Sequence, residues 1–313
     1  MAILMAGGKG FIGSQMIPKL LAQGEDIVCL EPRNTPGRLG DLTSRVRMEV
    51  GSVANMDDVM RVFSDHSITK VAGMVFFAFR DDPERLHDEM SIMVQGTANL
   101  FEAARLHGVK RVVFPSSIAY YGPQSLHGDG NTALSEDAPC LARSIYGIGK
   151  RLCEVLADDY NRHAGMDIVS MRIPAVYGPG GRVGSRGTNL IATQGAVHGS
   201  VVLPHAPNEQ VLIGHVVDVA EAGVRLLRAD HLAHRVYNVG GHTLSFEEIA
   251  AIGQDITPGL DVEYAPQAFP IELPYLIDYS RIEAELGVTH RQPRDAYVEL
   301  AALSRRNAGA GVE

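Results

Sequence analysis

Apolar residues recur along the chain in short runs that are separated by longer segments of mixed polarity. The runs have the length of buried strands and are rich in β-branched residues, and they cover residues 2–6, 26–31, 46–50, 71–79, 110–115, 168–173 and 236–239. Several intervening segments carry apolar residues at helical spacing, most clearly 14–23, 84–107 and 144–164. This alternation predicts an α/β fold, a Rossmann-type doubly wound parallel sheet.

The ends of the predicted strands indicate where a ligand binds. In a doubly wound sheet, ligands bind at the carboxyl edge of the strands. Glu31, Phe79, Ser117 and Pro174 all lie at or just past such an end. We therefore expect these four residues to share one cleft.

The character of the chain changes after Tyr177. Residues 178–187 hold five glycines together with Arg182 and Arg186, which is typical of a loop that orders around a substrate and equally of a solvated loop. Residues 200–210 and 244–313 read as short helices and strands interrupted by prolines. We predict a dinucleotide-binding domain of residues 1–176 plus 211–243 and a smaller C-terminal substrate lobe of residues 177–210 plus 244–313.

Composition narrows the class of protein. The chain has 313 residues, of which 45% are apolar and 21% charged, as in a globular protein with a large core. A formal net charge of −9 without a basic run disfavours nucleic acid as a partner. The longest apolar run, residues 71–79, is too short to cross a bilayer, and the first residues lack a basic signal segment. We expect no membrane partner and a cytoplasmic location.

Cysteines and histidines do not indicate a metal centre. Cys29, Cys140 and Cys153 are widely spaced, which suits free thiols in a reducing compartment. His231 and His234 lie near a predicted helix end, where contact with terminal carbonyl groups and solvent is the simpler interpretation. We therefore expect no metal ion.

A glycine-rich loop follows the first predicted strand. Gly7 permits a tight turn, Gly10 allows close approach to a pyrophosphate, and Gly13 allows a helix to pack on the strand. The spacing is G-x-x-G-x-x-G, and a turn without a ligand is the alternative. Glu31, at the end of the second strand, can accept the ribose hydroxyls of NAD and repel the 2′-phosphate of NADP. Lys9 and Arg33 favour NADP, but we give Glu31 more weight and predict NAD.

A tyrosine and a lysine four residues apart supply candidate chemistry. Tyr146 and Lys150 lie on one face of a predicted helix, about one turn apart. A phenol has a pKa near 10, and a neighbouring ammonium group favours the phenolate, which can then act as a base near neutral pH. An ordinary pair of helix surface residues is the alternative interpretation.

Taken in order, the motifs resemble those of the extended short-chain dehydrogenase/reductases, the NAD-dependent epimerase/dehydratase family. Residues 112–122 are similar to the fifth strand and catalytic serine segment of that family, and the residues that carry the other similarities are 96–104, 172–179, 215–220, 237–241 and 286–287. The resemblance implies that Ser117, Tyr146 and Lys150 are catalytic. It also implies the paired-helix homodimer that is common in this family.

The same resemblance implies the remaining contacts. The cofactor contacts expected beside the glycines and Glu31 are Phe11, Ile12, Arg33, Ser52, Val53, Phe77, Ala78, Tyr146, Lys150 and Pro174. The substrate contacts expected are Phe79, Ser117, Ile118, Ala119 and Ala175. To these we add three arginines from their positions in the sequence, Arg80 after the fourth strand and Arg182 and Arg186 on the glycine-rich loop. The three arginines suit an anionic substrate, although solvation or pairing with nearby acidic residues explains them as well.

Departures from the family pattern bear on the substrate. The arginine that grips a nucleotide diphosphate corresponds to Val211, and the asparagine that contacts the nucleotide corresponds to Ala175. We therefore expect an NAD-dependent oxidoreductase that transfers a hydride between nicotinamide and a secondary alcohol or ketone of a small polar substrate, such as a sugar or hydroxy acid. The alternatives are a sugar or nucleotide-sugar epimerase/dehydratase with transient hydride transfer and a non-catalytic dinucleotide sensor.

Overall fold

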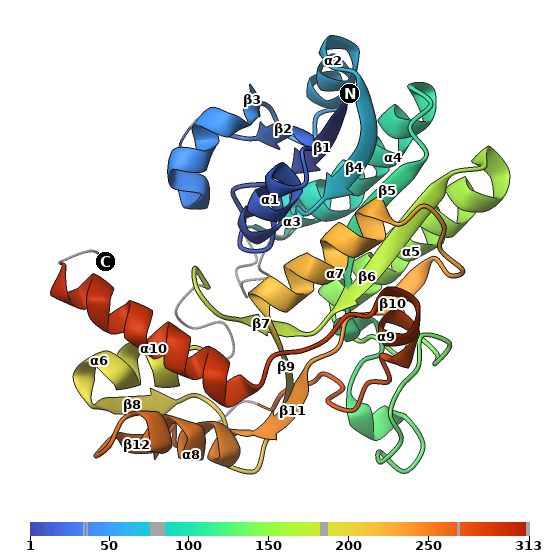
Figure 1. The fold of residues 1–313 in the computed structure, drawn as a ribbon. Helices are drawn as coiled ribbons and strands as arrows, with labels where there is room; N and C mark the ends of the chain where they lie inside the picture. Colours follow the sequence, from blue (N-terminus) through green and yellow to red (C-terminus); the bar gives the residue numbers. More distant parts are fainter. Residues whose placement is uncertain (34, 36, 76–84, 182–186, 268–269, 311–313) are drawn as a thin grey trace.

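A parallel sheet of seven strands forms the centre of the computed structural model, which describes residues 1–33, 35, 37–75, 85–181, 187–267 and 270–310 (Figure 1). The strands are β1 (Ala2–Ala6), β2 (Asp26–Glu31), β3 (Arg47–Val50), β4 (Ile68–Gly73), β5 (Arg111–Ser117), β6 (Asp167–Ile173) and β10 (Val236–Asn238). Their order is β10-β6-β5-β4-β1-β2-β3, and all neighbouring strands are parallel. The predicted Rossmann-type sheet is confirmed.

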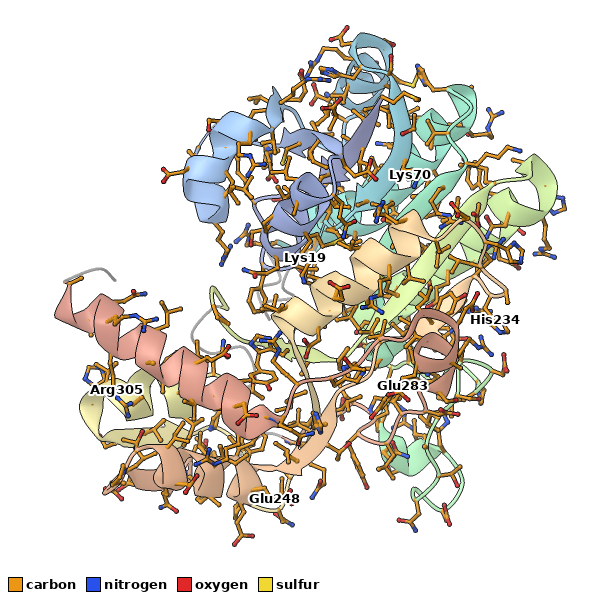
Figure 2. All side chains as sticks on the ribbon, in the orientation of Figure 1. Lys19, Lys70, His234, Glu248, Glu283 and Arg305 are labelled. Atoms are coloured by element: carbon orange, nitrogen blue, oxygen red, sulfur yellow. The ribbon has the colours of Figure 1, made fainter. Side chains whose placement is uncertain are left out.

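Helices cover both faces of this sheet. One face carries α1 (Gly13–Ala22) and α7 (Val216–Arg228), and the other carries α2 (Met56–Asp65), α4 (Gly96–Leu106) and α5 (Ile145–Ala164). Each layer buries its own apolar cluster against the strands, which explains why the strand residues are apolar on both sides. Lys19 of α1, labelled in Figure 2, forms an ion pair of 2.8 Å with Glu221 of α7, which joins the outer surfaces of the first layer.

Short helical segments supplement these layers. They are α3 (Leu86–Met90), π-helical segments at Ser91–Gln95 and Ile191–Gly195, and 3-10 helices at Gly37–Arg45, Ile118–Tyr120 and Gln124–Leu126. The predicted helix over 84–107 is therefore divided between α3, a π-helical segment and α4 over residues 86–106. No helix in the described part of the chain is both long enough and apolar enough to span a bilayer.

The strand order reverses between β1 and β4, because β2 and β3 extend from one side of β1 and β4 begins the other side. Ala6 and Gly73 are paired at the ends of these strands, directly before the glycine-rich loop. The predicted strand over 71–79 begins earlier, at Ile68, and ends at Gly73. This switch point is where doubly wound sheets bind ligands.

The chain leaves the large sheet after β6. Pro174 has no backbone N–H, which favours the end of a hydrogen-bonded ladder. The next strands, β7 (Ala175–Tyr177), β9 (Gln210–His215) and β11 (His242–Ser245), form a second sheet, and β8 (Ser200–Leu203) pairs with β12 (Asp261–Tyr264) in a third. These sheets pack with α6 (Ala196–His198), α8 (Phe246–Ile256) and α10 (Pro293–Gly309) around a separate apolar core.

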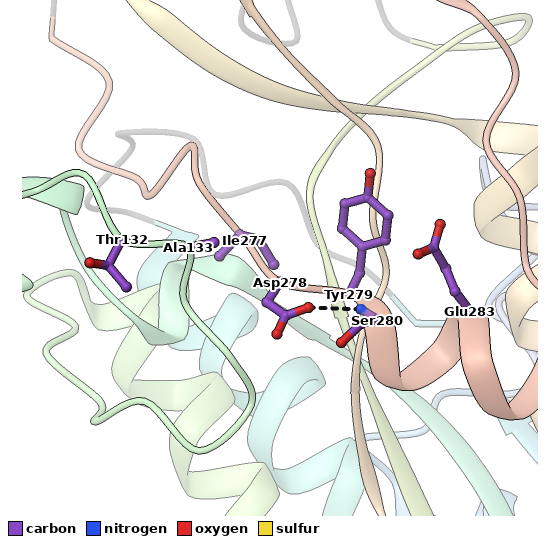
Figure 3. A pocket seen from close by; sticks show the side chains of 7 residues that line it. All are labelled: Thr132, Ala133, Ile277, Asp278, Tyr279, Ser280 and Glu283. Carbon is purple, nitrogen blue, oxygen red and sulfur yellow. Dashed lines mark hydrogen bonds between the residues drawn. The ribbon is translucent and has the colours of Figure 1, made fainter.

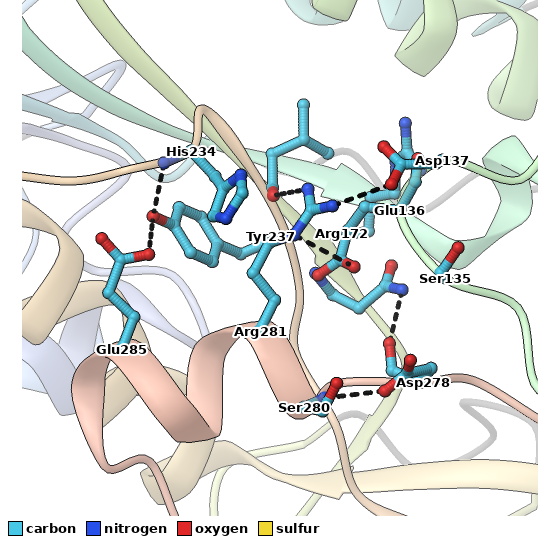
Figure 4. A network of polar contacts seen from close by, with 12 residues as sticks. Ser135, Glu136, Asp137, Arg172, His234, Tyr237, Asp278, Ser280, Arg281 and Glu285 are labelled. Carbon is cyan, nitrogen blue, oxygen red and sulfur yellow. Dashed lines mark hydrogen bonds and ion pairs between the residues drawn. The ribbon is translucent and has the colours of Figure 1, made fainter.

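The segment around α9 (Ser280–Leu286) packs on the large sheet although it lies in sequence between β12 and α10 of the smaller core. Figure 4 shows α9 beside the strand end that carries Tyr237, whose hydroxyl donates to Glu285 at 2.6 Å. Arg281 of α9 pairs with Asp137 at 3.1 Å. We keep the division into two lobes as a proposal, in which α9 links the C-terminal lobe back to the cofactor domain.

Candidate active site

The three glycines of the first loop each occupy a place that a side chain would obstruct. A Cβ on Gly7, which has a φ of +80°, would lie 2.6 Å from the carbonyl oxygen of Met74. A Cβ on Gly10 would lie 2.9 Å from the carbonyl oxygen of Gly7, and one on Gly13 would lie 2.4 Å from that same oxygen. The loop is therefore closed on itself at the edge of the sheet, which brings the start of α1 close to the end of β1.

The N-terminus of α1 suits an anion. No side chain caps the helix at Ile12, and its first turn holds no acidic residue. Backbone N–H groups at a helix N-terminus carry partial positive charge and bind phosphate. Phe11 and Ile12, both half-buried, lie in the loop immediately before this helix.

Glu31 is buried at the end of β2 beside the glycine-rich loop. Its Oε1 accepts a hydrogen bond of 2.7 Å from the backbone N–H of Lys9. The Lys9 ammonium group is also buried and donates to the carbonyl oxygen of Arg33 at 2.9 Å. Lys9 is thus engaged by the backbone, which weakens the sequence argument for NADP, whereas the Arg33 side chain is exposed.

The third strand end is held by its backbone. Ser52 and Val53 follow β3, and the carbonyl oxygen of Val53 accepts a hydrogen bond of 2.8 Å from the Asn99 side chain. A Cβ on Gly96 would lie 2.5 Å from a methyl carbon of Val53, so α4 approaches this turn closely. The Ser52 hydroxyl accepts from the Ala54 N–H at 3.2 Å. These contacts hold the turn at the carboxyl edge beside Glu31.

Ser117 is the last residue of β5. Its hydroxyl oxygen accepts a hydrogen bond of 3.1 Å from the N–H of Ala119 and so caps the short 3-10 helix that follows. Because this bond uses a lone pair of the hydroxyl, the O–H proton can be donated to another group.

Tyr146 and Lys150 lie on the first turns of α5, which Ser144 caps by accepting from the N–H of Gly147. The Lys150 Nζ atom lies 5.5 Å from the centre of the Tyr146 ring and donates to the carbonyl oxygen of Pro115 in β5 at 2.6 Å. A Cβ on Gly147 would lie 2.4 Å from the carbonyl oxygen of Ala119. The start of α5 therefore contacts the Ser117 segment directly.

Lys150 is 3% exposed. Burial lowers the pKa of its ammonium group to about 8, while the neighbouring Cys153 and then Glu154 raise it. The side chain is thus charged at neutral pH but close to its titration point. A cation placed beside the Tyr146 ring favours the phenolate over the phenol.

The described residues predicted on the substrate side have different environments. Ile118 is 1% exposed and packs in an apolar cluster with Tyr120 and Tyr121, so its side chain is part of the core. Ala119 is buried, and its carbonyl oxygen faces Gly147. Ala175 is half-buried at the start of β7, and Pro174, which is predicted as a cofactor contact, is buried beside Gly214.

Val211 has no access to a ligand through its side chain. It is 2% exposed on β9 and lies in the apolar core of the smaller sheets. Phe77, Ala78, Phe79, Arg80, Arg182 and Arg186 lie outside the described residues, so their predicted roles stay predictions.

The sequence of residues 3–240 matches the model of the NAD dependent epimerase/dehydratase family. The chain belongs to this family. The resemblance to the extended short-chain dehydrogenase/reductases that the motifs predicted is thereby confirmed.

Individual relatives of this epimerase/dehydratase family member are distant. A UDP-glucose 4-epimerase of Corynebacterium glutamicum is 26% identical over 99% of both chains. UDP-glucuronic acid decarboxylase 1 of Arabidopsis thaliana is 27% identical over 84% of this chain, which spans 60% of that relative's length. The solved GalE-like L-threonine dehydrogenase of Cupriavidus necator has the same fold, with a TM-score of 0.84 and 23% identity over 96% of this chain and 99% of its own.

The residues present fit the NAD that the family name implies. Side chains at Gly7, Gly10 or Gly13 would collide with backbone oxygens, the α1 N-terminus begins at this loop, and the buried Glu31 carboxylate lies at the end of β2, where such folds bind the adenosine ribose. Gly7, Gly10 and Gly13 would hold the pyrophosphate, Glu31 the adenosine ribose and Lys150 the nicotinamide ribose.

A Glu31→Ala variant is expected to bind NADPH and NADH with more similar affinities than the wild-type protein does. Loss of the carboxylate removes a hydrogen-bond acceptor for the ribose and also removes the repulsion of a 2′-phosphate. Together these effects should change the ratio of the NADPH and NADH dissociation constants by at least about ten-fold. The two constants can be measured by nucleotide fluorescence. Asp26→Ala, at the opposite end of β2, is the control. A wild-type protein that prefers NADPH would show that Lys9 and Arg33 dominate.

The His-Val-Val-Asp segment anchors the protein rather than a ligand. His215 caps α7, since its Nδ1 accepts from the Val217 N–H at 3.3 Å. Burial, and to a smaller extent Arg291, lower the pKa of His215 to about 4. Asp218 accepts hydrogen bonds of 2.9 and 3.0 Å from the backbone and side chain of Arg291, which ties α7 to the segment before α10.

Sequence reasoning missed several residues of the site. Gly147 and Gly149 lie between Tyr146 and Lys150, and a Cβ on Gly149 would lie 2.3 Å from the methyl carbon of Met93. Each glycine inside a helix destabilises the helix by about 1 kcal/mol. The presence of two glycines in this helix therefore indicated close packing. The buried partners of Asn99 and Glu154 left no comparable signal, because they are distant in sequence.

Other groups in the described residues show no separate chemistry. No group of three or more His, Cys, Asp or Glu side chains there could hold a metal ion. Burial raises the pKa of the Cys153 thiol, which disfavours a thiolate nucleophile. An open pocket of about 410 Å³ is lined by none of the predicted site residues (Figure 3), and its lining residues are Thr132, Ala133, Ile277, Asp278, Tyr279, Ser280 and Glu283.

Proposed function

We propose that this protein catalyses the reversible oxidation of a secondary alcohol to a ketone on a small polar substrate that carries no nucleotide. The proposal depends most on Val211, because the family's diphosphate-gripping arginine is replaced by a side chain that is 2% exposed in an apolar core. The side chain of Ala175, in place of that of the asparagine, offers no hydrogen bond to a nucleotide. The fold itself serves both UDP-glucose 4-epimerases and L-threonine dehydrogenases, so it leaves substrate size open.

Three side chains divide the chemistry in this proposal. When bound, NAD supplies the acceptor for the hydride that leaves the substrate carbon. Tyr146, as phenolate, takes the proton of the substrate hydroxyl, and Ser117 donates its free O–H to the oxygen as the carbonyl forms. Lys150 supplies the positive charge that keeps Tyr146 ionised and holds the ribose beside it.

The preference for NAD over NADP belongs to the same proposal and follows from Glu31. We also propose a cytoplasmic location, which suits three free and separated cysteines. A sugar epimerase is the second candidate, favoured by the 26% identity to a UDP-glucose 4-epimerase over nearly the whole of both chains.

A homodimer is a further part of the proposal. Four apolar side chains of α5 are 36–54% exposed at helical spacing on one face, namely Ile145, Ile148, Leu152 and Val155. Such a stripe suits packing against the same helix of a second copy. Sedimentation velocity should give about twice the monomer mass of 33.7 kDa. A monomer at micromolar concentration would contradict the proposal.

Ligand screening by thermal shift in the presence of NAD tests the substrate class. We expect stabilisation by at least one small alcohol among sugars, sugar acids, hydroxy acids and β-hydroxy amino acids, because a ligand at 100 times its Kd adds about 2.7 kcal/mol to folding stability. UDP and UDP-glucose should give no shift. Stabilisation by UDP-glucose alone would favour the epimerase.

A further inference from the structure

A buried ion pair lies directly behind the proposed catalytic residues. Glu154 of α5 and Arg172 of β6 are 5% and 2% exposed, and the guanidinium group donates to both carboxylate oxygens, at 2.9 and 2.7 Å. Ser116 of β5 donates a third hydrogen bond, of 2.5 Å, to Glu154 Oε1. One carboxylate therefore joins α5, β5 and β6.

Arg172 is held equally firmly on its other side. Its Nη1 donates to the Tyr121 hydroxyl at 2.8 Å and to the carbonyl oxygen of Glu136 at 2.9 Å, and its guanidinium carbon lies 3.6 Å from the centre of the Tyr120 ring. Figure 4 shows Arg172 beside the segment that carries Glu136. Burial alone would lower the pKa of Arg172, but the hydrogen bonds and charge of Glu154 outweigh it, so the pKa is raised.

The Glu154 contacts lie next to the proposed catalytic residues on both elements. Glu154 lies one helical turn beyond Lys150, and Ser116 immediately precedes Ser117. Lys150 bonds to Pro115 and Glu154 bonds to Ser116, so successive turns of α5 are fixed to successive residues of β5. Ser117 and the Tyr146–Lys150 pair come from different elements, and these two bonds set their separation.

Stability alone does not explain the ion pair, because well-packed apolar residues can replace a buried pair without loss of stability. We propose that Glu154 is a positioning residue of the active site. Its carboxylate, clamped by Arg172, holds Ser116 and the Lys150 turn of α5 so that Ser117, Tyr146 and Lys150 face one substrate atom. The proposal rests on the roles proposed for those three residues and is independent of the substrate.

The charge of Glu154 has a second effect at the same place. The titratable or charged groups around Lys150 are Tyr146, Cys153 and Glu154 on its own helix and Arg172 of β6, which faces Glu154. Removing the Glu154 charge leaves Arg172 unpaired nearby. Both changes disfavour the Lys150 ammonium group, so Lys150 should lose its proton at lower pH.

NADH binding measured by nucleotide fluorescence from pH 6 to 9.5 tests the proposal without a substrate. In the wild-type protein we expect affinity to fall as Lys150 loses its proton near pH 8. Glu154→Gln should move that midpoint down by about one pH unit. The matched control is Asp167→Asn, which removes the charge from the Arg111–Asp167 contact of 2.6 Å between β5 and β6, at the opposite ends of these strands. It should lower thermal stability and leave the midpoint unchanged.

If Glu154→Gln does not fold, the double variant Glu154→Gln/Arg172→Met, which removes both charges, is used in its place. A folded variant with the wild-type midpoint would overturn the proposal, and so would an equal movement in Asp167→Asn. If the NADH affinity of the wild-type protein did not vary with pH, Lys150 would have no role in binding NADH, and this proposal would be wrong. The ligand screen would still test the proposed substrate class independently.

Discussion

Replacing Tyr146 by Phe is expected to lower kcat by at least about 100-fold on any substrate that the ligand screen identifies. A positioned general base contributes about 10²–10⁴ to rate, and the variant loses the hydroxyl that takes the proton. The ring stays, and it is only half-buried beside Lys150. Folding stability should therefore change by no more than about 0.5 kcal/mol, and NADH affinity should be kept.

Tyr160→Phe is the matched control for this loss. Tyr160 lies on the same helix and donates its hydroxyl to Glu102 at 2.9 Å, remote from Ser117. Its variant should lose that bond and keep full activity. If Tyr146→Phe kept more than about one-hundredth of the wild-type rate, Tyr146 would not be the base.

Replacing Lys150 by Met should abolish activity and change how stability depends on pH. The folded pKa of Lys150 is about 8, against 10.5 for an ordinary lysine. Between these values the unfolded chain binds more protons, so the wild-type protein gains stability as pH rises. The cost of the buried charge is largest below pH 8, at about 3 kcal/mol, and fades toward pH 10.5. Lys150→Met has no charge at this position, so its stability lacks this dependence on pH.

Denaturant unfolding of both proteins measures this difference. From pH 7.5 to 9.5 the wild-type protein should gain about 2 kcal/mol relative to Lys150→Met. Lys110→Met, which removes an exposed lysine before β5, should run parallel to the wild-type protein. Parallel curves for Lys150→Met would mean that Lys150 carries no charge penalty in the folded state.

The elements that the sequence predicted well are those with local causes. Gly7, Gly10 and Gly13 follow a buried strand and lead into an amphipathic helix; Gly10 and Gly13 are required by contacts within their own loop, and Gly7 by its positive φ and by Met74 after the neighbouring strand. Glu31 and Ser117 end strands whose apolar runs are continuous in sequence, so their place at one edge follows from the fold class. The candidate triad of Ser117, Tyr146 and Lys150 came instead from the resemblance to a known family.

Non-local pairing explains what the sequence did not predict. Glu154 meets Ser116 and Arg172 only once α5, β5 and β6 are packed together. Lys9 looked free for a phosphate, yet its ammonium group is taken by the carbonyl oxygen of Arg33, 24 residues away. The predicted short elements after residue 244 include the 17-residue helix α10, whose apolar face is defined by packing on α6 and α8.

The formation of NADH at 340 nm tests the central claim most directly. Wild-type protein and Tyr146→Phe would be incubated with NAD and each of the small alcohols, with UDP-glucose and UDP-glucuronic acid as comparators. We predict that NADH accumulates in the wild-type protein with at least one small alcohol, remains at background with both UDP-sugars, and forms at least about 100-fold more slowly in Tyr146→Phe. Conversion of a UDP-sugar to an isomer without net NADH, with no small alcohol oxidised, would contradict the account.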